Sequence, residues 1–217
     1  MIFPTLKGKR FSYVNLDTFA RFWLPMTYDQ PMIQNPLLDP QVCQTMVDEC
    51  HNMLGVAYSY GGWMEDRSTL WRGSYLDRGA MFTHLGLDIN APVGTPVAVD
   101  MPGEIVLIDC DHPLVGGWGT RVMYKLDALP IVLIYGHLAA VRHVLGTRLC
   151  AGEVLAEIGP STTNGSWYTH VHVQAMTDEA YAGFLQDPPS LDGYSHERYI
   201  PTLVKLFPDP MQFVSIK

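Results

Sequence analysis

A run of short, alternating apolar segments between residues 82 and 176 constrains the fold more than any other feature of this chain. The segments are FTHLGLDIN, TPVAVD, GEIVLIDCD, TRVMYKLD, IVLIYGHLA, VLAEIG and THVHVQAM. Turn-forming pairs separate several of them, such as Pro102-Gly103, Gly116-Gly117 and Asn164-Gly165. Short strands at regular spacing with such turns are typical of antiparallel β architectures. The sequence therefore predicts a mainly β protein with an antiparallel sandwich or partial-barrel core.

The segments on either side of this region follow other patterns. Residues 39–54 have helical periodicity. Asp39 can cap the start of this helix, Pro40 suits its first turn and Gly55 can end it. We expect three parts, namely a partly helical N-terminal extension at 1–73, a β core at 74–178, and a C-terminal extension at 179–217 that packs on the core.

The charge balance excludes some classes of function. The 217 residues include 14 Lys and Arg against 22 Asp and Glu, which gives a formal net charge of -8. We expect no nucleic-acid partner, because such proteins carry basic patches. The longest apolar run, at 131–135, is far shorter than the ~20 residues of a membrane-spanning helix. The oligomeric state does not follow from the sequence.

The start of the chain lacks the pattern of a signal peptide, which predicts a cytoplasmic protein. A location in the cell envelope or outside the cell would require a removed leader or another export route. Cys43 and Cys50 are seven residues apart on the expected helix, or roughly 10 Å at ~1.5 Å per residue, too far for a disulfide. No CxxC pair occurs, and we expect buried free thiols at these positions and at Cys110 and Cys150.

Histidines on two expected strands indicate a metal site. Side chains alternate along a strand, so His84 and Asp88 share the face opposite the apolar residues of their segment. His170 and His172 share a face in the same way, with Gln174 after them. Two imidazoles and one carboxylate suit zinc and leave a fourth position open for water. An additional histidine could then act as a base, and His137 is another candidate for that work.

A single histidine on a strand is more often a surface or hydrogen-bonded residue than a metal ligand. The combination of His-x3-Asp, a later Tyr-Gly-His and a final His-x-His is much harder to obtain by chance. The remaining histidines receive no role; they are His51, His112, His143 and His196.

The same stretches resemble the lysostaphin/LytM-type zinc metallopeptidases, whose fold is called the duplicated hybrid motif. The matching stretches, in chain order over roughly 95 residues, are His84-Leu85-Gly86-Leu87-Asp88, Ala91-Pro92-Val93-Gly94-Thr95-Pro96-Val97, Pro102-Gly103-Glu104-Ile105-Val106, Tyr135-Gly136-His137-Leu138, Gly152-Glu153-Val154-Leu155-Ala156 and His170-Val171-His172. Two of them correspond to the HxGxD-type and HxH ligand motifs of that bacterial family.

The resemblance implies a site and a reaction. His84, Asp88 and His172 would be the ligands of one Zn²⁺ ion, with His170 as the base and His137 as the stabilising histidine. The protein would be an endopeptidase that hydrolyses peptide bonds with a metal-activated water. Its substrate would be a peptide or peptidoglycan, cleaved in the stem or bridge peptides. We expect the segment 1–73 to cover or shape the substrate groove.

The sequence departs from the family pattern near its last motif. Gln174 stands where the family has Glu, and it can orient a ligand without the charge. Trp167 and Tyr168 predict a bulkier rim around the groove. Two alternatives stay open. One is a catalytically silent module of the same fold that holds metal for binding or regulation. The other is a cupin-like metalloprotein, although cupins place a Glu and a further His after their HxH.

Overall fold

A large mixed β-sheet organises the protein. The computed structural model describes residues 1–28, 34–111, 116–187 and 191–217. Within these residues a ten-stranded sheet has the order β1-β2-β4-β11-β8-β7-β6-β9, with β10 pairing β5 and β8. Its strands are β1 (Phe11–Tyr13), β2 (Tyr58–Gly61), β4 (Leu87–Asn90), β5 (Pro96–Ala98), β6 (Gly103–Cys110), β7 (Thr120–Leu126), β8 (Ile131–Ala139), β9 (Arg148–Leu149), β10 (Val154–Ile158) and β11 (Val171–Thr177). The prediction of a mainly β protein is confirmed.

The centre of this sheet brings the sequence-predicted residues together. Strand β11 lies between β4 and β8 and is antiparallel to both. His172 is directly opposite Asp88 on β4 and Gly136 on β8. Cross-strand neighbours of this kind have Cβ atoms about 5 Å apart. The register therefore places residues from three segments, far apart in the sequence, at one point of the sheet.

Alternation along these strands separates the core from the site. Leu87 and Ile89 on β4, with Val171 and Val173 on β11, point into the main apolar core. Their neighbours Asp88 and His172 lie on the other face, as the period of two requires. Strand β8 is covered on both faces: its second face packs against the helix α4 (Asp178–Gln186).

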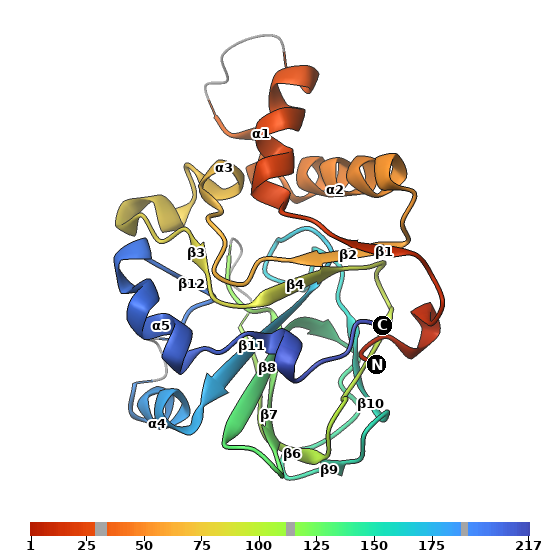
Figure 1. Ribbon diagram of the computed structural model, residues 1–217, viewed down its shortest axis with the longest axis vertical. Helices are drawn as coiled ribbons and strands as arrows, with labels where there is room; N and C mark the ends of the chain where they lie inside the picture. The colour runs from red at the N-terminus through yellow and green to blue at the C-terminus, as the bar shows by residue number, and fades with distance from the viewer. Residues whose placement is uncertain (29–33, 112–115, 188–190) are drawn as a thin grey trace.

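The segment before residue 73 adds both strands and helices. Strand β2 pairs antiparallel with β4, while β1 pairs parallel with β2 because the helical segment between them returns the chain to the same end. The helices are α1 (Leu16–Thr27), α2 (Pro40–Leu54) and α3 (Ser68–Trp71), and α1 and α2 lie above β1 and β2 in Figure 1. The predicted helix begins and ends as expected: Asp39 accepts a hydrogen bond from the Gln41 amide, and Gly55 adopts a left-handed conformation.

The helical layer has its own apolar cluster, which also includes Trp167 and Tyr168 from the loop before β11. Cys43 and Cys50 on α2 belong to this cluster, together with Trp71, and both thiols are buried without a disulfide. Cys110 and Cys150 are exposed, so the prediction of buried thiols is wrong for these two. The reason is that both lie where strands end at the surface, Cys110 at the end of β6 and Cys150 just after β9.

The C-terminal segment packs back on the core, as predicted. Strand β12 (Tyr194–Ser195) pairs with β3 (Thr83–His84) in a separate two-stranded sheet, and the helix α5 (Ile200–Leu206) follows. Val214 and Ile216 are buried in the main core. The Ile2 amide donates a hydrogen bond to the Ser215 carbonyl, so the two ends of the chain lie side by side (Figure 1). The boundaries at 73/74 and 178/179 stay a prediction.

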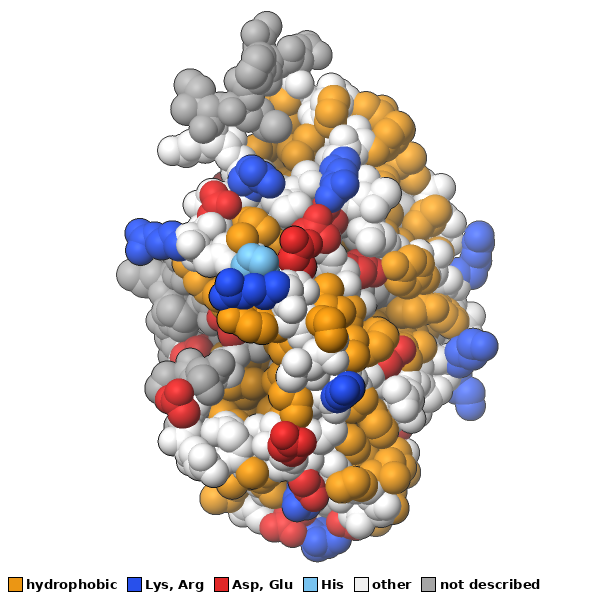
Figure 2. Space-filling model, turned by 60° about the vertical axis from the view of Figure 1, so that its left-hand side comes forward, with side chains coloured by type: hydrophobic (Ala, Val, Ile, Leu, Met, Phe, Trp, Pro, Cys, Tyr) orange, Lys and Arg blue, Asp and Glu red, His pale blue; other side chains and the backbone are white. Residues whose placement is uncertain are grey.

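The distribution of charge and the length of the helices concern possible nucleic-acid and membrane partners. On the face in Figure 2, basic and acidic side chains are interspersed and form no continuous basic patch. Among the described residues, no helix is both long enough and apolar enough to cross a membrane.

Candidate metal centre

Three side chains converge on one point beside the central β4–β11 pair of the large sheet. The Nε2 atom of His84 is 3.0 Å from Nδ1 of His172 and 3.3 Å from Oδ1 of Asp88. The His172 Nδ1 and Asp88 Oδ1 atoms are 3.2 Å apart. All three residues are buried, with at most 3% of their surface exposed. These donors surround a space suited to one metal ion, and they are the set that the family resemblance implied.

The backbone around His84 differs from the single strand expected. The segment is divided into β3 and β4, and Leu85 and Gly86 separate them. A Cβ atom on Gly86 would lie 2.3 Å from His172 Nε2, so only glycine allows the imidazole to lie against this strand. The break moves His84 into the small sheet, yet His84 and Asp88 still point to the same place.

The electrostatics of the three donors favour a cation. Burial lowers the pKa of His84, which keeps its imidazole neutral at pH 7. Burial alone would raise the pKa of Asp88, but the surrounding His84, His170 and His172 hold this pKa well below its ordinary value. Neutral imidazoles and an ionised carboxylate are the forms that bind metal.

Gln174 orients His172, as expected from the sequence. The His172 Nε2–H group donates a hydrogen bond to Gln174 Oε1 over 3.1 Å. This contact leaves Nδ1 of His172 unprotonated and directed at Asp88 and His84. An amide therefore occupies the position of the usual carboxylate and keeps the same ring nitrogen available.

His170 and His137 lie beside the three donors. Nδ1–H of His170 donates to the Tyr168 carbonyl at 2.9 Å, and Nδ1–H of His137 donates to the Asn164 carbonyl at 2.7 Å. Each ring therefore presents an unprotonated Nε2. The two ring centroids are 4.5 Å apart, and Nε2 of His170 is 3.4 Å from Asp88 Oδ1. Both histidines can accept a proton next to the metal position.

The backbone of His137 is held in an unusual conformation. Its φ of 63° is in the left-handed region that non-glycine residues seldom adopt. Its amide donates to the Trp118 carbonyl, and its carbonyl accepts from the Gly159 amide. Such strain is often found at functional sites, and here it aims the imidazole into the pocket.

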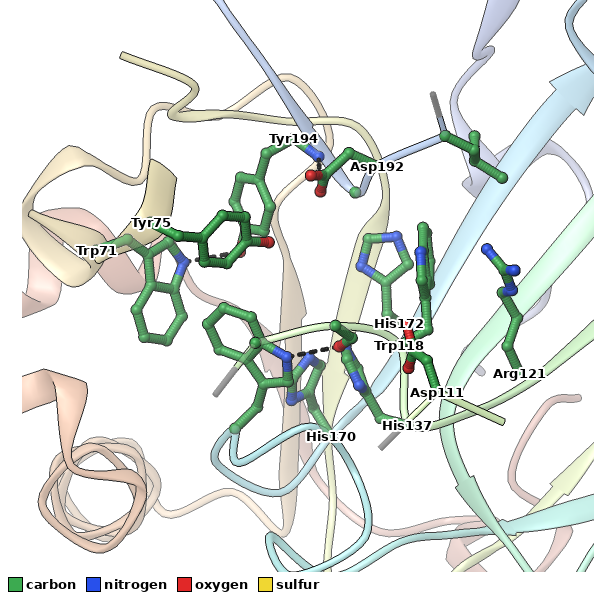
Figure 3. Close-up of a pocket in the computed structure, with 15 residues that line it drawn as sticks. Trp71, Tyr75, Asp111, Trp118, Arg121, His137, His170, His172, Asp192 and Tyr194 are labelled. Carbon is green, nitrogen blue, oxygen red and sulfur yellow. Dashed lines mark hydrogen bonds between the residues drawn. The ribbon is translucent and has the colours of Figure 1, made fainter. Parts of the chain in front are cut away.

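A pocket of about 510 Å³ opens over these histidines (Figure 3). Its walls come from all three parts of the chain. The residues that sequence reasoning did not select include Trp71, Tyr75, Asp111, Trp118, Arg121, Asp192 and Tyr194. The indole of Trp71 donates to the Tyr194 hydroxyl at 2.7 Å, which joins the N-terminal and C-terminal extensions across the pocket. For Trp71 and Tyr75 the available signal was the concentration of Trp and Tyr between residues 56 and 80.

The prediction that Trp167 and Tyr168 form a bulky rim is correct only for Trp167. Trp167 lines the pocket, but Tyr168 is 1% exposed and lies beneath it. Tyr168 is buried because the residue after it, Thr169, is bonded through its amide to Gln44 of α2, which covers this loop.

The histidines without an assigned role have ordinary partners. His51 contacts the Ser59 hydroxyl at 2.8 Å, and His143 contacts the Val154 carbonyl at 2.8 Å. His196 accepts a hydrogen bond from the Arg198 amide. His112 lies outside the described residues.

The metal-free protein is expected to lose stability in weak acid. Burial lowers the pKa of His84 and of His137, and lowers that of His170 to about 4. Below pH ~6.5 the unfolded chain binds protons that the folded chain does not, so stability is complete above this pH and falls below it. His170 alone contributes a loss of about 1.6 kcal/mol between pH 6.5 and 5, since half of the unfolded imidazoles are already protonated at pH 6.5.

Urea unfolding of the chelator-treated chain at pH 7.5, 6.5 and 5 measures this loss. His170→Asn is the matched variant, because it removes one of the titrating imidazoles and should have a shallower slope. Equal free energies of unfolding at pH 6.5 and 5 would show that the imidazoles are not buried in their neutral form.

Comparisons with known proteins give matches to the region of the chain that carries the five candidate site residues. Residues 82–183 match the model of peptidase family M23. Two curated relatives, the DD-carboxypeptidase/endopeptidases Mpg of Neisseria meningitidis and Neisseria gonorrhoeae, are each 34% identical over 92 residues. That match covers 42% of this chain and 20% of each relative, so the chain spans about a fifth of their length.

Solved structures of similar fold include two peptidases. The catalytic domain of the antimicrobial peptidase lysostaphin from Staphylococcus simulans has a TM-score of 0.41 and 22% identity, over 56% of this chain and 80% of that domain. A zinc-containing peptidase from Vibrio cholerae has a TM-score of 0.39 and 20% identity, over 45% of this chain and 28% of the other.

Proposed function

Residues 82–183 belong to peptidase family M23, of the lysostaphin/LytM type, and we propose that the protein is a zinc-dependent endopeptidase. The observation that carries this proposal is the convergence of five side chains at one place, where His137, His170 and His172 line the pocket. Three of them, His84, Asp88 and His172, form a compact set of metal donors. The other two, His170 and His137, present free ring nitrogens beside that set.

In this proposal His84 Nε2, Asp88 Oδ1 and His172 Nδ1 hold the zinc. The donor set fits the ion: it is buried, it carries one negative charge, and its atoms all lie within 4.8 Å of one another. When bound, zinc polarises a carbonyl and lowers the pKa of a coordinated water towards ~7. Gln174 keeps His172 in the tautomer that this binding requires.

His170 acts as the general base and His137 as the stabilising group. The position of His170 Nε2 near Asp88 Oδ1 puts it closest to where a water nucleophile would bind, and its Nδ1–H bond to Tyr168 fixes the ring. The His137 ring lies beside that of His170, with centroids 4.5 Å apart, and once protonated it can donate to the developing oxyanion or the leaving amine. Burial, together with the neighbouring His170 and His172, lowers the pKa of His137 well below its ordinary value, so its imidazole is neutral before the reaction.

The proposed substrate is peptidoglycan, cleaved in its stem or bridge peptides. Two observations support this class. The family model matches the β core, and the curated relatives are named for carboxypeptidase and endopeptidase activities. In this proposal the substrate peptide would lie in the pocket, whose lining includes Trp71, Trp118 and Trp167.

Metal analysis combined with hydrolysis tests the proposal. We expect about one zinc per chain, and release of new amino groups from purified peptidoglycan or a pentaglycine peptide. A chelator should abolish the release and added zinc should restore it. Zinc binding without cleavage of either substrate would instead favour a silent metal-holding module. Iron with dioxygen chemistry would favour the cupin-like alternative.

A further inference from the structure

A buried arginine lies behind the proposed metal centre. The Arg67 side chain is 1% exposed, and none of its three guanidinium nitrogens makes a hydrogen bond within the described residues. Two carboxylates are within ion-pair distance of Nη2: Glu65 Oε2 at 3.3 Å and Asp88 Oδ2 at 3.8 Å. A buried guanidinium is costly unless it is paired. The position of the Arg67 guanidinium therefore indicates that this side chain has a role at Asp88.

The N-terminal segment brings Arg67 to this place by pairing with the strand of His84. The amide of Met64 donates to the His84 carbonyl, the amide of His84 to the Glu65 carbonyl, and the amide of Arg67 to the Phe82 carbonyl. On its other edge, β3 pairs with β12. The strand that carries one proposed ligand is therefore held between the N-terminal and C-terminal extensions.

Space for the guanidinium is created by a glycine. A Cβ atom on Gly62 would lie 2.6 Å from Arg67 Nη2 and 2.6 Å from His84 Nδ1. Such contacts are closer than side chains tolerate, and the φ of Gly62 is 119°. The backbone here is thus shaped to let Arg67 reach past His84 toward Asp88.

Tyr168 approaches the same carboxylate oxygen from the β core. Its hydroxyl donates to Asp88 Oδ2 over 3.1 Å, and its ring stacks on His170 with centroids 4.3 Å apart. The other oxygen of Asp88, Oδ1, faces His84, His170 and His172 at 3.2–3.4 Å. The two oxygens of Asp88 therefore have separate surroundings: Arg67 and Tyr168 at Oδ2, and the imidazoles at Oδ1.

We propose that Arg67 and Tyr168 are positioning residues that hold Oδ2 of Asp88, so that Oδ1 alone is presented to the metal. This inference rests on the proposed function, since it assumes that Asp88 is a zinc ligand. It makes the N-terminal segment a structural part of the metal centre, through a residue that lies outside the family-matched region. Partners that fix a ligand in this way commonly change metal affinity by about 10- to 100-fold.

The first test compares two tyrosine variants of the full chain. Tyr168→Phe removes the hydroxyl at Asp88 and should weaken zinc binding by about 10-fold, as measured by competition with a chromogenic chelator. Tyr58→Phe is the matched control, because Tyr58 is equally buried and its hydroxyl donates to the Ile216 carbonyl at 2.8 Å, away from the site. Thermal unfolding of both metal-free variants measures the general cost of losing a buried hydrogen bond.

The comparison separates positioning from a purely structural role. A structural role for Tyr168 would lower the unfolding temperature, as in Tyr58→Phe, and leave zinc affinity unchanged. Equal zinc affinity in Tyr168→Phe and the parent would therefore overturn the proposal for Tyr168.

The second test removes the buried cation together with its partner. The double variant Glu65→Gln/Arg67→Met keeps the net charge around the metal unchanged, and Gln can still accept the hydrogen bond that Tyr13 donates to Glu65 Oε1. Zinc affinity should fall by about 10-fold. Unchanged or tighter zinc binding would overturn the role of Arg67. If this variant does not fold, Arg67→Lys, which keeps the charge but shortens its reach, must weaken zinc binding for the proposal to stand.

Zinc binding by the parent chain distinguishes the two levels of inference. A parent that binds no zinc would overturn the proposed function and this inference with it. A parent that binds zinc as tightly as the folded variants would overturn only the positioning role of Arg67 and Tyr168.

Discussion

Substitution of His172 by alanine is expected to abolish zinc binding and peptide hydrolysis together. His172 contributes Nδ1 to the donor set and lies opposite Asp88 across the β4–β11 pair. Its loss leaves one imidazole and one carboxylate, too few donors for a stable zinc site. Metal content should fall from about one zinc per chain to background, and product release should fall to the level of the chelator-treated parent.

The control for this variant is His143→Ala. His143 lies outside the site. Within the described residues, its ring contacts the Val154 carbonyl. Its zinc content and activity should equal those of the parent. Retention of zinc by His172→Ala would mean that the metal is bound elsewhere, and the assignment of the donor set would be wrong.

Alanine at His170 or His137 is expected to give the opposite combination, with zinc retained and hydrolysis lost. Neither residue belongs to the compact donor set, yet each directs an unprotonated Nε2 into the pocket. Loss of a general acid–base group commonly costs about 10²- to 10⁴-fold in rate. The measurement is kcat/KM on peptidoglycan fragments, with metal content determined on the same samples.

The two single variants and their combination also test whether the histidines act as a unit. If His170 and His137 serve successive proton transfers in one reaction, the kcat/KM of the double variant should be only slightly lower than that of the less active single variant. Activity within about 3-fold of the parent in both single variants would contradict the assigned roles. Loss of zinc in either variant would assign that histidine to the donor set instead.

Local patterns in the sequence were sufficient for much of the site. Alternation along THVHVQAM places His170, His172 and Gln174 on one face, and the structure has this arrangement within and next to β11. The helix at Pro40–Leu54 followed from its cap, its proline and its terminal glycine. These features depend on residues within a few positions of one another, so the backbone geometry of a strand or helix is enough to predict them.

Other features depend on contacts that no local pattern encodes. The division of β3 from β4 at Leu85 and Gly86 arises because β3 pairs with the 64–67 segment and with β12, while β4 pairs in the large sheet. The exposure of Cys110 and Cys150 depends on where strands end at the surface. These outcomes are decided by which segments pair, and one of the pairs, β3 with β12, joins His84 to Tyr194, far apart in the sequence.

The sequence by itself determined that the β core resembles a metallopeptidase and which five residues would form its centre. Tertiary structure decided the surroundings of that centre. It brought Trp71 from the N-terminal segment and Tyr194 from the C-terminal segment to the same pocket, and placed Arg67 behind the donor set, next to Asp88. Ligand motifs can be recognised in the sequence because their spacing follows the strand period. The residues around them come from distant segments, and only the folded chain brings them next to the ligands.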